Sequence, residues 1–239
     1  MELAVDTSTN TAGVALSDQG TILSEITWQT NHNHTVELIP EIIELLEEQK
    51  LVVSDISAIT VARGPGSFNG LRVGLAVAKG LAFALGIGLV GIGTLEAAAF
   101  ACADYENHVC AILPAGRGEI ASATFQKQGS NWQKLSAEHI TTIESLCERI
   151  VQKTVFCGEI SREQREQLKE KLGEKAYFPQ ETAIQGRAGC LAKLGWCRIE
   201  NGDFGNPATL QPLYLRKPSI TKPRRRKNDA MSNMRTGMQ

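Results

Sequence analysis

The chain has 239 residues and a formal net charge of −1, with 42% hydrophobic and 21% charged residues. That length suits one large or two small domains, and the composition is ordinary for a soluble globular protein. The balanced charge excludes an overall field that would attract nucleic acid, although residues 219–239 carry a net charge of +5 against −6 for the rest.

The first hundred residues alternate between strand and helix signals. Apolar stretches bounded by turn-forming residues predict five strands, at residues 3–6, 11–16, 21–28, 57–61 and 89–92. Helical periodicity predicts three helices, at residues 34–50, 70–86 and 94–103, the last capped by Thr94. The order β-β-β-α-β-α-β-α describes a ribonuclease H-like core. We therefore expect an α/β, two-lobed actin-like ATPase fold with mixed sheets flanked by helices.

The second half repeats this architecture weakly, without a sequence repeat. Strands are predicted at residues 109–113, 119–126, 132–137 and 154–157, and helices at residues 141–151, 162–172 and 182–199. From Pro218 the chain becomes rich in proline and arginine and loses periodicity. We expect an N-terminal lobe at residues 1–104, a C-terminal lobe at residues 105–218 and a disordered basic tail at residues 219–239.

The cysteines and the N-terminus favour a cytoplasmic protein. The six cysteines form no C-x-x-C pair, which excludes zinc ribbons and thioredoxin-like sites and favours reduced, mostly buried thiols. Glu2 and Asp6 lie where a signal peptide needs a basic start and an apolar run. The longest uncharged run of the apolar stretch 63–99 has 16 residues, against the roughly 20 that span a bilayer. We expect no membrane association.

A glycine-rich turn, RGPGSFNG at residues 63–70, lies between a predicted strand and a predicted helix. Backbone N–H groups at such a position can hold an anion. The turn matches neither the P-loop nor the dinucleotide fingerprint. We favour a structural role, in which the glycines permit a tight turn and Ser67 or Asn69 caps the helix. Both interpretations stay open, and the candidates for cofactor contact here are Gly64, Gly66, Ser67, Gly70 and Arg72.

Asp6, followed by Thr7-Ser8-Thr9, resembles the Asp-x-x-Thr phosphate hairpin of sugar kinases. It is a further cofactor candidate that could hold magnesium through water, but we favour a role in capping its own turn. His32 and His34 are two residues apart, whereas metal-binding helices space histidines four apart. The sequence contains no nucleophile elbow and no H-E-x-x-H motif. We predict no catalytic residue, no metal ligand and no tightly bound cofactor.

Small residues recur every fourth position along the helix that follows the glycine turn, at Gly70, Gly74, Ala78, Ala82 and Gly86. This small-residue ladder would let another helix approach closely. Most other positions of the helix are apolar, and a helix apolar nearly all round is buried nearly all round. The covering element is either the helix at residues 34–50 or a second protein.

Four segments together resemble the bacterial TsaB (YeaZ) family: LAVDTSTNTAGVAL, HTVELIPEI, RGPGSFNGLRVG and PLYLRKP. The resemblance covers residues 1–218. It implies a subunit of the machinery that makes N6-threonylcarbamoyladenosine at position 37 of tRNAs reading ANN codons. Two departures from the family pattern are Asn69, where threonine is usual, and residues 114–121, where the family often has Asp-Ala-Arg-x-Gly-Glu-Val-Tyr.

The TsaB family is similar to TsaD, the subunit that transfers the threonylcarbamoyl group. TsaD carries a metal-binding His-x-x-x-His, and Thr94 and Ala98 stand at the matching positions here. The resemblance therefore implies a pseudo-enzyme. The alternatives are an M22-like peptidase and an ATP-binding small-molecule kinase.

The resemblance also implies partners. It implies pairing with TsaD through the helices at residues 34–50 and 70–86, a homodimer through an overlapping surface, and docking of the ATPase TsaE, through which the complex uses ATP. The chain would bind tRNA as part of the complex. The basic tail at residues 219–239 would either contact tRNA or only aid solubility. The candidate interface residues are His34, Glu37, Glu41, Gly70, Gly74, Ala78, Ala82 and Gly86.

Overall fold

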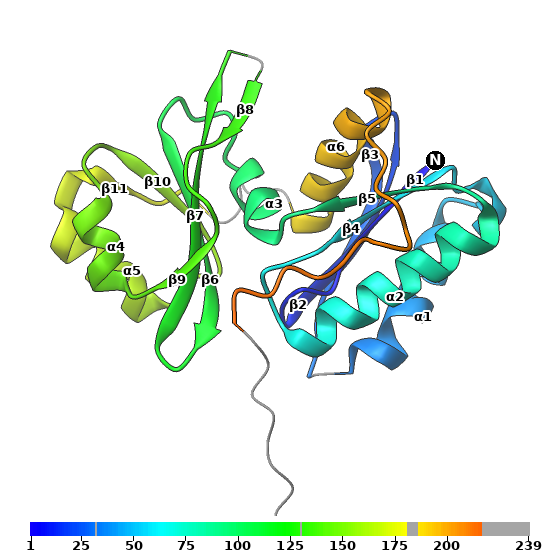
Figure 1. Cartoon of the computed structure of the whole chain (residues 1–239), viewed down its shortest axis with the longest axis horizontal. Helices are drawn as coiled ribbons and strands as arrows, with labels where there is room; N and C mark the ends of the chain where they lie inside the picture. The colour runs from blue at the N-terminus through cyan, green and yellow to red at the C-terminus, as the bar shows by residue number, and fades with distance from the viewer. Residues whose placement is uncertain (32, 130, 181–185, 217–239) are drawn as a thin grey trace, which may run out of the picture.

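Two mixed β-sheets, each flanked by helices, form the two lobes of the protein (Figure 1). The computed structural model describes residues 1–31, 33–129, 131–180 and 186–216. Its architecture is the α/β, two-lobed arrangement of mixed sheets flanked by helices that the sequence predicts. The predicted tail at residues 219–239 and the first residues of the predicted helix at 182–199 lie outside the described residues.

The first sheet has the strand order β3-β2-β1-β4-β5. Its strands are β1 (Glu2–Asp6), β2 (Thr11–Asp18), β3 (Thr21–Gln29), β4 (Ala58–Ala62) and β5 (Gly88–Ile92). The first three strands form the predicted antiparallel meander, and β4 and β5 join them in parallel. Helices α1 (His34–Glu48) and α2 (Phe68–Leu85) cover one face, and α6 (Arg187–Glu200) covers the other (Figure 1).

Alternation along the strands divides the core of this lobe. Leu3 and Val5 belong to the cluster that packs under α1 and α2, whereas Ala4 and Ala15 belong to the cluster under α6. Side chains of successive strand residues point to opposite faces, so large residues serve one face and small residues the other. The small side chains let α6 lie close to the sheet.

The second sheet has the order β11-β10-β6-β7-β8, with β9 paired to β7. Its strands are β6 (His108–Gly116), β7 (Glu119–Gln128), β8 (Asn131–Lys134), β9 (His139–Thr141), β10 (Thr154–Gly158) and β11 (Ala176–Tyr177). Helices α4 (Ile143–Arg149) and α5 (Arg162–Leu172) pack on one face around Phe156. Helix α3 (Thr94–Phe100) packs on the other face, between the two lobes.

Two predictions about this organisation are wrong. Helix α6 contacts β1 and β2 of the first sheet, so residues 105–218 do not form one lobe by themselves. Thr94 does not cap α3, because Gly93 occupies the N-cap and the buried Thr94 hydroxyl has no hydrogen-bond partner. The position of α6 is determined by packing against strands that are distant in the sequence. Local periodicity does not predict such packing.

Helix α2 is long and apolar enough to cross a membrane by length and composition alone. Its inner side, with Leu71, Leu75, Ala78 and Ala82, is buried in the first lobe, and 33% of the apolar window is buried. Gly86 ends the helix in a left-handed conformation at φ +66°, which glycine adopts without strain.

Candidate functional site

The turn after β1 is a buried polar cluster centred on Asp6. The Asp6 carboxylate is almost fully buried, and its Oδ1 accepts hydrogen bonds from the backbone N–H and the hydroxyl of Ser8. Its Oδ2 accepts a hydrogen bond from Nε of Arg187, at the start of α6. The predicted capping of the turn by Asp6 is thus confirmed. The arginine partner occupies the side of the carboxylate that a cation would otherwise approach.

The glycine turn packs directly against the Asp6 turn. The N–H of Ser67 donates to the Ser8 carbonyl at 2.6 Å, and the Thr7 hydroxyl donates to the Gly70 carbonyl at 2.8 Å. A Cβ atom added at Gly66 would overlap the Ser8 carbonyl, and one at Gly70 would overlap the Thr7 carbonyl. Ser67 is the N-cap of α2 and accepts from the Gly70 N–H at 3.3 Å. These contacts favour the structural interpretation of the turn over an open anion cradle.

The C-terminal segment 206–216 runs back across the first lobe and closes the glycine turn from the other side. The N–H of Leu213 donates to the Arg63 carbonyl at 2.6 Å, and Leu210 packs on Gly91. Gly64, at φ +112°, lies against the Leu213 carbonyl, which a Cβ atom would approach to 2.6 Å. The close approach and the positive φ both require glycine at this position.

A cavity of about 430 Å³ opens between the lobes beside this segment. Arg72 lies over the Phe68 ring at 3.9 Å from its centroid, and its Nε donates to the Tyr214 hydroxyl at 3.3 Å. Arg216 pairs with Glu119, which follows the turn where the family pattern is altered. The cavity wall offers one tyrosine and one arginine but no acid, histidine, cysteine or serine among the described residues. It therefore lacks a nucleophile with a general base.

The small-residue ladder does not face a partner, and the interface prediction is wrong for most of its residues. A Cβ atom at Gly74 would overlap the Thr7 hydroxyl, and Ala78 is fully buried. His34 is also buried, with Nε2 at 3.0 Å from the Thr9 carbonyl. Small side chains let α2 approach β1 and its turn, and Gly70 also lies against His34 of α1. Among the eight interface candidates the inward-facing residues are His34, Gly70, Gly74, Ala78 and Ala82.

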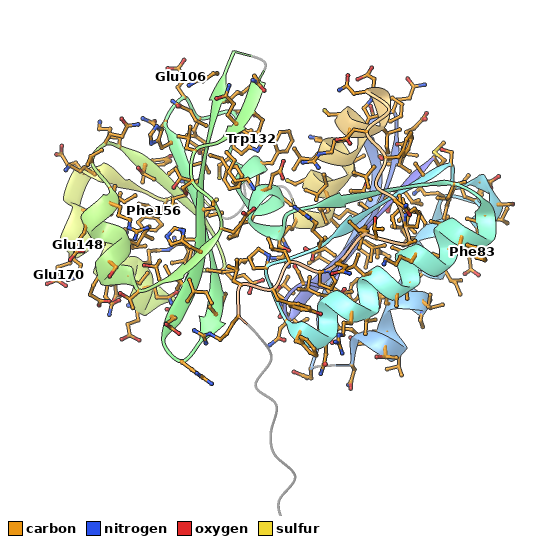
Figure 2. All side chains as sticks on the ribbon, in the orientation of Figure 1. Phe83, Glu106, Trp132, Glu148, Phe156 and Glu170 are labelled. Atoms are coloured by element: carbon orange, nitrogen blue, oxygen red, sulfur yellow. The ribbon has the colours of Figure 1, made fainter. Side chains whose placement is uncertain are left out.

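The outer side of the same two helices carries exposed apolar side chains. Phe83, near the end of α2 (Figure 2), is 88% exposed, and Val36 of α1 is 69% exposed. We call this surface the α1–α2 face, which consists of Val36, Ile39, Ile43, Ala76, Gly80, Phe83 and Ala84. Glu37 and Glu41 lie half-buried beside it, and Glu37 accepts from the Trp28 indole N–H at 3.1 Å. Exposed apolar side chains that gather on two helices make this side of the lobe a candidate interaction site.

Thr94 and Ala98, the positions that the family resemblance matches to metal ligands, are both buried. Thr94 is fully buried, and Ala98 is 7% exposed in the core between α3 and the second sheet. Among the described residues no three His, Cys, Asp or Glu side chains gather to hold a metal. His32 lies outside the described residues.

The cysteines are free thiols, four of them buried. Burial raises the pKa of Cys110 to about 11 and that of Cys190 to about 12. Both thiols therefore stay protonated at neutral pH, and a protonated thiol is a poor nucleophile.

Two residues of the Asp6 cluster have no signal in the sequence. Arg187 and Glu159 lie 181 and 153 residues from Asp6 along the chain, and neither belongs to a motif. Only the return of α6 to the first sheet brings Arg187 to the turn. Their pairing depends on tertiary structure that pattern analysis does not resolve.

Comparison with known proteins gives a consistent result. The family described as "TsaD: tRNA N6-adenosine threonylcarbamoyltransferase" matches residues 21–183. The tRNA threonylcarbamoyladenosine biosynthesis protein TsaB of Bacillus subtilis is 28% identical over 217 residues, which are 90% of this chain and 93% of the relative. TsaB of Escherichia coli is 31% identical over 63% of this chain and 66% of its own length.

Among solved structures, YeaZ from Pseudomonas aeruginosa superposes with a TM-score of 0.72 at 24% identity. The superposition covers 90% of this chain and 99% of that protein. At 24% identity, this structural similarity is evidence for the fold alone.

Proposed function

This chain belongs to the TsaD (tRNA N6-adenosine threonylcarbamoyltransferase) family, and from that premise we propose that it supports the transferase without performing the transfer. Its place is in the biosynthesis of tRNA threonylcarbamoyladenosine, as the names of its TsaB relatives indicate. The product would be N6-threonylcarbamoyladenosine at position 37 of tRNAs reading ANN codons. The observation that carries this proposal is the α1–α2 face, an exposed apolar surface. It lies on a family member whose Asp6 carboxylate is already bonded to Arg187.

The interior of the site supports a non-catalytic role. Asp6 is committed to Ser8 and Arg187, which disfavours a kinase that would use this carboxylate for a metal–nucleotide. Thr94 and Ala98 replace the histidine pair of TsaD, and alanine has no atom that can bind a metal. These features also disfavour an M22-like peptidase, because neither a metal pair nor an activated nucleophile is available among the described residues.

The α1–α2 face supports docking of TsaD through these two helices. Phe83 would be the central anchor, since large exposed aromatic residues contribute strongly to interfaces. Glu44, Glu47 and Glu48 lie exposed on α1, so the partner surface is expected to carry basic residues around an apolar centre. The same face would form the homodimer of the isolated chain, and TsaE would dock at the junction and supply the ATPase. The assembly would work in the cytoplasm and meet tRNA as a complex.

The first prediction tests docking. Phe83→Glu is expected to weaken binding to the TsaD of the same organism by about 100-fold or more, because burying an unpaired carboxylate costs several kcal/mol and about 1.4 kcal/mol is tenfold. The fold should survive, since Phe83 is exposed. Calorimetric titration with TsaD gives the affinity, and threonylcarbamoylation of tRNA by the reconstituted complex gives the activity.

The matched control is Val151→Glu, which places the same charge on an exposed apolar residue of the second lobe. It should bind TsaD like the wild type. Light scattering during size-exclusion chromatography follows the homodimer in parallel. A folded Phe83→Glu protein that binds TsaD with wild-type affinity would locate the interface elsewhere.

The second prediction concerns metal. Protein purified from cells and dialysed against chelator is expected to contain no stoichiometric zinc or iron, because Thr94 and Ala98 cannot replace two histidines. Elemental analysis by plasma mass spectrometry provides the measurement. One metal ion per chain, retained through dialysis, would contradict the pseudo-enzyme assignment.

A further inference from the structure

The buried side chain of Arg187 contacts residues of both lobes. Its Nη2 donates to the Thr9 hydroxyl and to the Thr11 carbonyl, both at 2.7 Å, in the first lobe. Its Nη1 donates at 3.0 Å to Glu159, which follows β10 of the second lobe. Together with the bond to Asp6, all three guanidinium nitrogens have carboxylate, hydroxyl or carbonyl partners. The planar fork of arginine suits this arrangement, whereas the point charge of lysine would not.

The second lobe holds Glu159 in place for this contact. The N–H of Glu159 donates to the Ile112 carbonyl of β6 at 2.9 Å. Gly158, at φ +96°, makes the turn, and a Cβ atom there would overlap the same carbonyl. The Thr9 hydroxyl of the first lobe donates to the Glu159 carboxylate as well. Glu159 is therefore positioned by its own lobe and bonded twice by the other.

The position of Arg187 in α6 is unfavourable without these partners. It is the first residue of the helix, where the macrodipole disfavours a positive charge. Its side chain is only 13% exposed. Burial acts to lower the pKa of Arg187, but the charges of Asp6 and Glu159 outweigh it, so the pKa is raised and the guanidinium stays charged.

The fold implies a metal–nucleotide beside Asp6, and the residues present do not fit one. A divalent cation would have to approach Asp6 and Glu159 at the place that the guanidinium fills, against its charge. We infer that Arg187 is the resident cation of this site: it takes the position of the metal and holds the lobes together through Glu159. This inference goes beyond the proposed function, which needs only the α1–α2 face.

The cation position is tested with Mn²⁺, titrated into the full chain while free Mn²⁺ is followed by electron paramagnetic resonance. The wild type is expected to have no saturable site that depends on Asp6. Arg187→Met, which leaves Asp6 and Glu159 uncompensated, should gain such a site, and Arg187→Met with Asp6→Asn should lose it again. A folded Arg187→Met protein without the gain would overturn the inference, as would wild-type binding that Asp6→Asn abolishes.

The connection between the lobes is tested separately, without changing Arg187. Spin labels at Asp18→Cys in the first lobe and Glu170→Cys in the second report the interlobe distance, with Cys147 and Cys197 replaced by serine. Glu159→Ala is expected to shift the distance distribution to longer values and to broaden it. Glu159 is 30% exposed, so its loss removes little core packing.

Glu166→Ala is the control for this measurement, because it breaks the exposed Arg162–Glu166 pair within the second lobe. Its distance distribution should match that of the spin-labelled protein in which Glu159 and Glu166 are both retained. If the Glu159→Ala distance distribution superimposes on that of the spin-labelled protein with Glu159 retained, the Arg187–Glu159 contact does not fix the lobes relative to each other. That result would overturn the inference.

Discussion

Ala78→Glu is expected to unfold the protein. Ala78 has no exposed surface and lies among Leu3, Leu38 and Leu75 in the core beneath α1 and α2. A buried carboxylate without a partner costs several kcal/mol, which is comparable to the roughly 5–15 kcal/mol of a whole domain's stability. Circular dichroism should show loss of helix at room temperature or a large fall in the urea midpoint.

Ala76→Glu is the matched control, two positions earlier on the same helix. Ala76 is exposed, so the same charge should stay hydrated and change the unfolding free energy by less than about 0.5 kcal/mol. The pair separates the inner side of α2 from the α1–α2 face. An Ala78→Glu protein with wild-type stability would show that the helix turns another side to the sheet.

Gly195→Ala is expected to have the next largest effect. Gly195 lies in the middle of α6, and a Cβ atom there would come to 2.8 Å from Cβ and Cγ2 of Thr60 and overlap its hydroxyl. Thr60 is buried in β4, so the helix must move off the sheet. Overpacking of this kind costs about 1–3 kcal/mol, measured as a lower free energy of unfolding in urea.

Gly80→Ala is the contrasting change, since nothing lies within 4 Å of the new methyl group. At this exposed helical site alanine should raise stability by about 0.5–1 kcal/mol through helix propensity. Thr60→Ala should recover part of the loss caused by Gly195→Ala, because it removes the clashing hydroxyl and methyl groups. If Gly195→Ala lowers the free energy of unfolding by the same amount with and without the Thr60→Ala substitution, close packing against Thr60 is not the cause.

Most of the fold was accessible from sequence because its elements have clear local signals. The helix predicted at residues 162–172 has the bounds of α5, and the three strands of the meander differ by two residues at most. The short strands β9 and β11 were missed because three and two residues are too few for a periodicity. The position of α6 was missed because helical periodicity does not say which sheet an apolar side covers.

The candidate site was predictable only where its residues are neighbours in sequence. The Asp6 turn and the glycine turn have recognisable composition, and Ser67 caps α2 as one of the two predicted capping residues. The ladder from Gly70 to Ala82 was correctly seen as a close-packing device, but periodicity cannot tell a helix partner from a strand and its turn. The exposed Phe83 was missed because an apolar helix gives no contrast between its inner and outer sides.

The return of α6 to the first sheet has a consequence for synthesis of the protein. The chain leaves the first lobe after β5, builds the whole second lobe, and only then supplies the helix that covers Ala4 and Ala15. A nascent chain emerges from its N-terminus, and domains generally fold as units during synthesis. The lobe that is made first is therefore the last to be completed. Until residues 187–200 have left the ribosome, one apolar side of its sheet is uncovered, and transiently exposed apolar surface of this kind favours aggregation.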